Sequence, residues 1–121
     1  MIQDRATSEG NYQRFIERAR ESGKVWGLRG DDGWAYCASN EYEDTDVLVF
    51  WSDRAYAQRH AQADWRGHKP TVIPLDEFID NWLQGMHNDG ALVGPNWDPE
   101  LCGLEVEPRE VADKLTADET A

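Results

Sequence analysis

The sequence predicts a single α+β domain with a layered α/β architecture, in which helices pack on one mixed, largely antiparallel sheet in the order αβββαβαββα. Three observations lead to this class. Apolar residues recur at helical spacing in several segments, short apolar or alternating segments lie between them, and turn residues separate the two kinds. The chain has 121 residues, 40% of them apolar, which is enough to bury one core in one compact domain.

We expect the first helix over residues 8–21, after a flexible lead-in of residues 1–7. Thr7 or Ser8 can cap its start, and Gly23 suits its end. The helix is predicted from four apolar residues at helical spacing: Tyr12, Phe15, Ile16 and Ala19.

A hairpin follows, with strands over residues 24–29 and 34–39. The intervening "GDDG" supplies residues that tolerate positive φ, as a tight hairpin turn requires. The next stretch, "NEYEDTD", is predicted to be a solvated acidic loop, since its carboxylates do not follow the spacing of a calcium-binding loop.

The segment "VLVFW", residues 47–51, is apolar at every position. A strand that is apolar on both faces is usually central in its sheet and covered on both sides. Ser52 and Asp53 follow at once and suit the cap and first turn of a helix, which we expect to continue to about Ala63.

The second half repeats the alternation of strand and helix. After the short strand "TVIP", residues 75–86 form the clearest predicted helix, because six apolar residues follow its period without a miss, and "NDG" ends it at Gly90. We expect "ALVG" and the alternating "LCGLEVE" to pair as an antiparallel hairpin. A last helix begins at Pro108, before a frayed acidic tail over residues 117–121, so the globular domain covers residues 8–116.

The charge of the chain narrows the choice of partner. The formal net charge is −12, from 24 acidic against 12 basic residues. Coulomb repulsion disfavours nucleic acid and anionic membranes, so neither is expected as a partner. A basic protein is the electrostatically favoured partner, although solubility alone also explains such a charge.

The location is predicted from what the chain lacks. The N-terminal "MIQDRATSEG" has no apolar core of a signal peptide, and no stretch approaches the length of a membrane span. Cys37 and Cys102 form no C-x-x-C pair and are read as small core residues. We therefore expect a cytoplasmic protein with reduced thiols.

Ser52 is the first candidate for chemistry, because strand-to-helix turns can carry a nucleophile. The glycines of a sharp nucleophile elbow are absent around it, and His60 lies roughly 12 Å further along a helix, too far to act as its base. A helix cap is the better interpretation of Ser52. We assign no catalytic residue.

The same helix start remains a candidate ligand site, since free N–H groups and the helix dipole there attract anions. The residues that would line it are Trp51, Ser52, Arg54 and Trp65. Asp53 argues against it by offering the dipole a built-in anion. Trp65 and Trp97, both in connections, either clamp loops against the core or line a groove.

No metal or cofactor is predicted. His60 and Asp64 can share a helical face, but they give two ligands of mixed type without a local third. The P-loop and the dinucleotide-binding fingerprint are both missing.

Several ordered motifs resemble a bacterial family catalogued as domain of unknown function 2750. They are "NYQRFIERARESGKVWGL", "DGWA", "VLVFWSDRAYA", "VIPLDEFIDNWLQGMHNDGALVG" and "LEVEPREVADKL", and the likeness covers about residues 11–116. The resemblance implies a soluble, single-domain α/β protein and transfers no functional site to any residue.

Three functions follow as hypotheses. The first is a non-catalytic binding or regulatory domain that acts through a basic protein partner, with an immunity-like protein as a special case. The alternative is a small-ligand or anion-binding domain whose site lies at the helix start after Trp51. An enzyme that uses carboxylates or Cys37 is the third, and it lacks visible partner residues.

Overall fold

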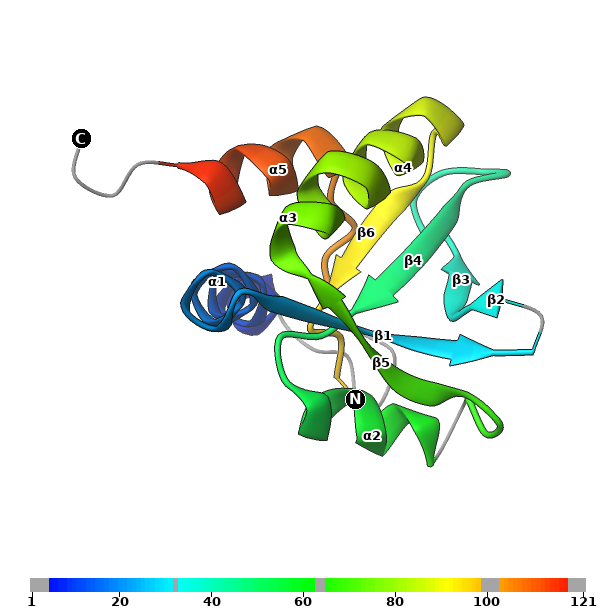
Figure 1. The fold of residues 1–121 in the computed structure, drawn as a ribbon. Helices are drawn as coiled ribbons and strands as arrows, with labels where there is room; N and C mark the ends of the chain where they lie inside the picture. The colour runs from blue at the N-terminus through cyan, green and yellow to red at the C-terminus, as the bar shows by residue number, and fades with distance from the viewer. Residues whose placement is uncertain (1–4, 32, 63–64, 99–102, 118–121) are drawn as a thin grey trace.

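The computed structural model describes residues 5–31, 33–62, 65–98 and 103–117 (Figure 1). In these ranges, four strands follow the first helix, and helical segments then alternate with single strands, with the following bounds. The helices are α1 (Arg5–Ser22), α2 (Arg54–Ala61), α3 (Leu75–Glu77), the π-helical segment η1 (Phe78–Leu83), α4 (Gln84–Asp89) and α5 (Pro108–Thr116). The strands are β1 (Lys24–Gly30), β2 (Gly33–Trp34), β3 (Tyr36–Ala38), β4 (Asp46–Phe50), β5 (Lys69–Pro74) and β6 (Leu92–Pro95).

The α+β class is confirmed, but the strands form two three-stranded sheets where one was expected. Their orders are β2–β1–β5 and β3–β4–β6, and β4 pairs antiparallel with β3 and parallel with β6. The division arises because the strand expected over residues 34–39 turns from one sheet to the other at Ala35. The Ala35 amide donates to the Leu28 carbonyl of β1, at 2.9 Å, while the Val49 amide of β4 donates to the Ala35 carbonyl, at 3.4 Å.

The two sheets also meet at the opposite end of β1. Trp26 and Trp51 form an isolated antiparallel bridge, with both N–H···O distances at 2.8 Å. The strand β4 therefore has neighbours along its whole length, from β3 through Ala35 to Trp26. Its predicted central position is confirmed.

Side chains of β4 alternate between two apolar clusters, which explains why the strand is apolar throughout. Phe50 belongs to a first cluster with the helices α1, η1, α4 and α5, and Leu48 packs against that cluster. Val47, Val49 and Trp51 belong to a second cluster with α2. Figure 1 shows the corresponding layers, with α3, α4 and α5 on one side of the strands and α2 on the other.

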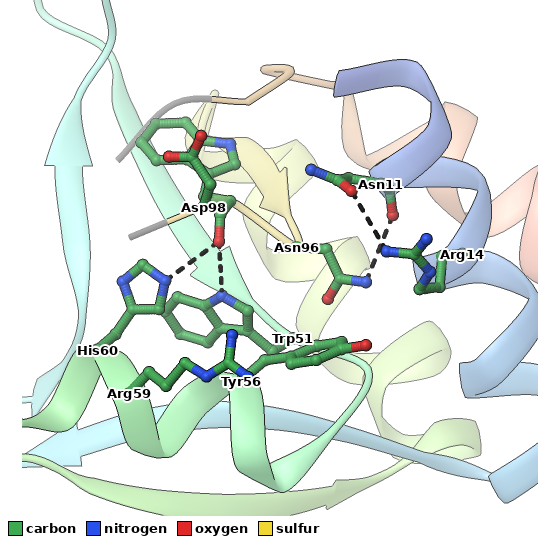
Figure 2. Close-up of a pocket in the computed structure, with 9 residues that line it drawn as sticks. Asn11, Arg14, Trp51, Tyr56, Arg59, His60, Asn96 and Asp98 are labelled. Atoms are coloured by element: carbon green, nitrogen blue, oxygen red, sulfur yellow. Dashed lines mark hydrogen bonds between the residues drawn. The ribbon is translucent and has the colours of Figure 1, made fainter. Parts of the chain in front are cut away.

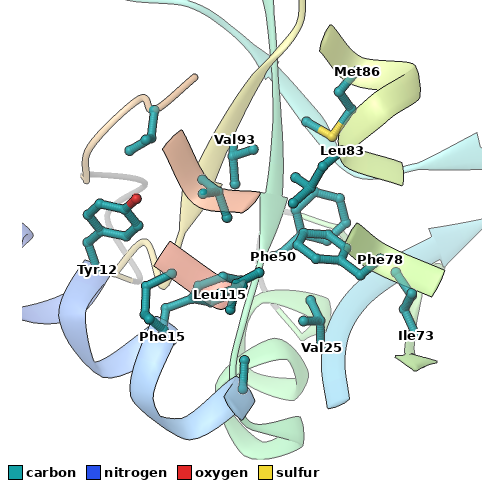
Figure 3. Close-up of a cluster of buried hydrophobic side chains, with 14 residues drawn as sticks. Tyr12, Phe15, Val25, Phe50, Ile73, Phe78, Leu83, Met86, Val93 and Leu115 are labelled. Atoms are coloured by element: carbon teal, nitrogen blue, oxygen red, sulfur yellow. The ribbon is translucent and has the colours of Figure 1, made fainter. Parts of the chain in front are cut away.

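The first cluster is almost wholly aliphatic and aromatic (Figure 3). Phe78 lies at its centre and makes edge-to-face contacts with Phe15 and Phe50, at centroid distances of 6.4 and 4.9 Å. Its fourteen buried members are Tyr12, Phe15, Ile16, Ala19, Val25, Phe50, Ile73, Phe78, Leu83, Met86, Val93, Val106, Val111 and Leu115. All four apolar residues that predicted the first helix are among them.

Most helix boundaries agree with those expected from the sequence, and the start of the first helix differs most. The first helix begins at Arg5, so residues 5–7 of the expected lead-in are helical. Gly23, with φ of 73°, ends it by donating its amide to the Ala19 carbonyl, as predicted. Gly90, with φ of 74°, likewise ends α4, and Pro108 opens α5.

The helix expected over residues 75–86 is present but contains the π-helical segment η1. The wider turn brings Phe78 and Leu83, five residues apart, into the same buried cluster. A 3.6-residue period in the sequence cannot distinguish this local widening from a regular helix. None of the helices in the described ranges is both long and apolar enough to cross a membrane.

The prediction of a strand over "LCGLEVE" is wrong for residues 103–107. Residues 101 and 102 lie outside the described ranges. Only Val106 pairs, in an isolated antiparallel bridge with Val93, with N···O distances of 2.8 and 2.9 Å. The reason is the Trp97 side chain, which packs against Gly103 and donates its Nε1–H to the Leu104 carbonyl, at 2.8 Å. An indole thus occupies the place where a strand would pair.

Candidate functional site

The turn after Trp51 differs from its predicted form by one residue. Asp53, with φ of −128° and ψ of 140°, is the N-cap of α2, so the assignment of the cap to Ser52 is wrong. Ser52 is buried, and its hydroxyl donates to Asp53 Oδ1 at 2.7 Å. The serine therefore supports the turn from within and does not cap the helix.

Asp53 binds an arginine of α1. Arg18 Nε donates to Asp53 Oδ1 at 2.6 Å, and Arg18 Nη2 donates to Oδ2 at 2.5 Å. The hydrogen bonds from Arg18 hold the pKa of the Asp53 carboxyl below its usual range. The start of α2 is thus occupied by a carboxylate of the same chain, which argues against a ligand anion at the helix start itself.

Asn96 connects three parts of the fold at this turn. Its backbone has φ of 48°, a left-handed conformation that asparagine tolerates better than most residues, and its amide donates to the Phe50 carbonyl at 2.9 Å. Its side-chain Oδ1 accepts from the Ser52 amide at 2.8 Å. Its Nδ2 donates to Ser52 Oγ at 3.1 Å and to the Asn11 carbonyl at 3.4 Å. Asn96 thereby fixes α1 and the start of α2 relative to β6.

The next carbonyl, that of Trp97, organises a set of aromatic rings. It accepts from Trp51 Nε1 and from His60 Nε2, both at 3.1 Å (Figure 2). Because a carbonyl only accepts hydrogen bonds, His60 carries a proton on Nε2. The His60 ring packs against Trp51 at a tilt of 34° with a centroid distance of 4.6 Å, and the Trp65 ring lies 6.1 Å from Trp51 and 5.9 Å from His60.

A pocket of about 350 Å³ lies over this network, and we call it the Trp51 pocket (Figure 2). Trp51 has no exposed surface and, with the buried His60, Asn96 and Trp97, forms the floor. The other five lining residues reach solvent and form the rim: Asn11, Arg14, Tyr56, Arg59 and Asp98. Figure 2 shows α1 carrying Asn11 and Arg14 on one side of the pocket and α2 carrying Tyr56 and Arg59 below it.

Two guanidinium groups of the rim are held in place by neighbours on their own helices. Arg14 Nη1 donates to Asn11 Oδ1 at 3.4 Å, and the Arg59 guanidinium lies 5.9 Å from the centroid of the Tyr56 ring. Within the described ranges, neither guanidinium forms a salt bridge, and the Tyr56 hydroxyl has no hydrogen-bond partner. The rim therefore presents two guanidinium groups and a hydroxyl to the pocket, together with the carboxylate of Asp98.

The four residues that the sequence pointed to are only partly brought together. Trp51 forms the floor of the pocket, and Ser52 supports its wall through Asn96. Arg54 is exposed and outside the lining residues. Trp65 packs behind Trp51 and lines a separate hollow along β2 and β3.

Sequence reasoning missed the rim. Asn11 and Arg14 are three residues apart on α1, and Tyr56 and Arg59 have the same spacing on α2, so each pair shares a helical face. That spacing is visible in the sequence, but the approach of the two helices is not. Trp97 was expected either to clamp its loop against the core or to line a groove, and it does both, because it is buried in the second cluster and lines the Trp51 pocket.

Other expected candidates contribute no ligand cluster in the described part of the chain. No group of three His, Cys, Asp or Glu residues there could hold a metal ion. Asp64 and Cys102 lie outside the described residues, and Cys37 is half-buried in β3. Ser39, directly before the acidic loop, donates its hydroxyl hydrogen to Glu105 Oε1.

The fold and the pocket define a single-domain α+β protein with an open, polar, arginine-bearing site. The chain belongs to the family of proteins of unknown function DUF2750, whose model matches residues 12–115. The resemblance drawn from the sequence motifs is thereby confirmed. Neither the curated proteins nor the solved structures contain a match to the chain.

Proposed function

We propose that this domain is a non-catalytic binding protein that holds a small anion in the Trp51 pocket. The observation that carries the proposal is the pair Arg14 and Arg59, which come from different helices and line one pocket without an ion pair in the described residues. The chain has twice as many acidic as basic residues, so carboxylate partners are abundant elsewhere. Asp98 lines the same pocket, and Arg14 also acts electrostatically on Asp53, but neither pocket arginine forms a salt bridge in the described residues, so a bound anion would add the charge partner that both lack.

The hydrogen bonds below the pocket favour binding over catalysis. Ser52 Oγ donates to Asp53 and accepts from Asn96, and His60 Nε2 donates to the Trp97 carbonyl. A nucleophile and a base would have to hydrogen-bond each other, whereas these groups are bonded to structural partners.

Calorimetric titration of the full chain with inorganic phosphate, sulfate, acetate and citrate tests the proposal. The double variant Arg14→Gln/Arg59→Gln should weaken binding of the best anion by at least about tenfold, since it removes two charged donors. Arg54→Gln is the matched control, because Arg54 is an exposed arginine of α2 outside the pocket. Equal binding by the wild type and the double variant, or equal loss in the control, contradicts the proposal.

A second candidate function is that a basic protein partner docks on the acidic loop between β3 and β4. The protein would then act in the cytoplasm, with an immunity-like protein as a special case. It is supported by Tyr36 and Tyr42, which are each 59% exposed on either side of Ser39. Tyrosine is enriched at interface hot spots. Four exposed carboxylates accompany them: Glu41, Glu43, Asp44 and Asp46.

A pull-down with the purified chain as bait, at low and at physiological salt, tests this second candidate. A partner that is released by salt and by Tyr42→Ala supports it. The absence of any salt-sensitive partner in both conditions counts against it.

A further inference from the structure

The directions from which the rim approaches the pocket limit the shape of the anion. Arg14 and Arg59 reach it from two different helices, and the Tyr56 hydroxyl adds a third donor (Figure 2). A carboxylate is planar and accepts one guanidinium fork along its edge. A phosphoryl group has three terminal oxygens in a pyramid, so it can accept from two forks and a hydroxyl at the same time.

The charges around the pocket favour one anionic group with more than one negative charge. Arg14 and Arg59 are cationic, and Asp53 is paired with Arg18, with a smaller electrostatic contribution from Arg14. Asp98, which also lines the pocket, lies on the side of Asn96 away from Arg14 in Figure 2. A phosphomonoester carries about −1.5 to −2 charges near pH 7, against −1 for a carboxylate.

The size of the pocket limits the rest of the ligand. Its volume of about 350 Å³ is at the lower end of the range for small-molecule sites. A phosphoryl group with a small organic substituent fills such a space, whereas a dinucleotide does not.

From these three observations we infer that the ligand of the Trp51 pocket is a small phosphomonoester, with its phosphoryl group held by Arg14, Arg59 and the Tyr56 hydroxyl. This inference rests on the proposed anion-binding function. It adds the chemical class of the anion and a role for Tyr56.

Phenyl phosphate and benzoate form a matched pair of probes, because each is one ring with one anionic group. Both are titrated calorimetrically into the full chain at about pH 7.5 and at about pH 5, where a phosphomonoester has lost most of its second charge. At the higher pH, phenyl phosphate should bind at least about tenfold more tightly than benzoate. At the lower pH, this ratio of the two affinities should fall several-fold.

Tyr56→Phe tests the hydroxyl while keeping the ring under Arg59. The variant should weaken phenyl phosphate several-fold and leave benzoate nearly unchanged. Equal loss for both probes would contradict the assigned role of the hydroxyl.

The outcomes separate the two proposals. If the two probes bind with equal affinity and Arg14→Gln/Arg59→Gln abolishes both, the phosphomonoester inference is overturned. The proposed anion-binding function is then retained. If neither probe nor inorganic phosphate binds, both proposals fail. Inorganic phosphate that binds as tightly as phenyl phosphate supports the phosphoryl group and overturns a contribution from the organic substituent.

Discussion

The two clusters on either side of β4 are built from different kinds of contact. In the first cluster, Phe78 and its neighbours are held by apolar packing, and the polar atoms lie at its edges. In the second cluster, Trp51 and Trp97 are buried together with hydrogen bonds that join their polar atoms to a histidine and to backbone carbonyls. The pocket lies over the second cluster.

This difference indicates that the first cluster mainly stabilises the fold, whereas the second cluster also positions the residues of the pocket. Apolar packing depends on buried area and close contact, and it tolerates small shifts in direction. A buried hydrogen bond is directional and costly to lose, so it fixes the groups around it. We therefore expect substitutions in the first cluster to reduce stability, and substitutions in the second to reduce stability and alter the pocket as well.

The largest expected effect is from Phe78→Ala in the first cluster. Phe78 has no exposed surface and contacts two other phenylalanines, so the free energy of unfolding should fall by about 3–5 kcal/mol. Urea denaturation measures this loss. The remaining folded protein should keep its affinity for anions, and a loss below about 1 kcal/mol would contradict the central place given to Phe78.

Asn96→Ala should have the next largest effect. It removes the amide that pairs with Ser52 and places a Cβ-bearing residue at φ of 48°, for an expected cost of about 2–4 kcal/mol. Asn96→Gly is the control that removes the same hydrogen bonds without the backbone strain, and it should be less destabilising by about 1 kcal/mol. Both variants should weaken anion binding, and unchanged binding in both would show that Asn96 does not position the pocket.

Gly103→Ala tests the close packing of the Trp97 indole against the segment in which the last strand was expected. A Cβ at residue 103 would overlap Trp97 Cδ1, so this ring must shift, at an expected cost of about 1–3 kcal/mol. Gly85→Ala is the matched control in α4, where a Cβ meets nothing within 4 Å. The control should raise stability by about 0.5–1 kcal/mol, as alanine is the better helix former. The same sign of change in both variants, measured by thermal unfolding, would contradict the close packing of Trp97.

The smallest expected effect concerns pH. Asp53 has its pKa lowered from an ordinary value of 3.8 in the folded protein, mainly by its hydrogen bonds with Arg18. The stability that this pair contributes is therefore complete above about pH 4 and is lost as the pH falls through the lower folded-state value. Asp53→Asn should give a shallower loss of stability below about pH 4, and Arg18→Gln should give the same shallower slope. Parallel acid-unfolding curves for all three proteins would rule out the linkage.

The sequence was informative where an element depends on its own residues. The apolar run before Ser52 predicted a central strand, and Gly23, Gly90 and Pro108 predicted helix boundaries, because these features depend on local conformation and burial. The bend at Ala35 was not predictable, since it depends on hydrogen bonds to two strands of different sheets, β1 and β4.

The candidate site was predictable in location but not in composition. The hydrophobic-to-polar change at Trp51 pointed to the right turn, but the rim comes from α1, from the first two turns of α2 and from Asp98. Only the packing of α1 against the turn, through Asn96 and through Arg18, brings Arg14 and Arg59 to one pocket. Contacts of that kind leave no periodic signal in a single sequence.

The most direct test of the account is a nuclear magnetic resonance titration that follows the indole N–H signals of the six tryptophans. With phenyl phosphate, the signals of Trp51 and of the Asn96 side-chain amide should shift and saturate together, because both lie in the floor of the pocket. Trp34 and Trp82, which pack against the first cluster, should stay unchanged. Saturable shifts confined to Trp34 and Trp82, or binding seen by calorimetry without any shift at Trp51 and Asn96, would contradict the assignment of the site.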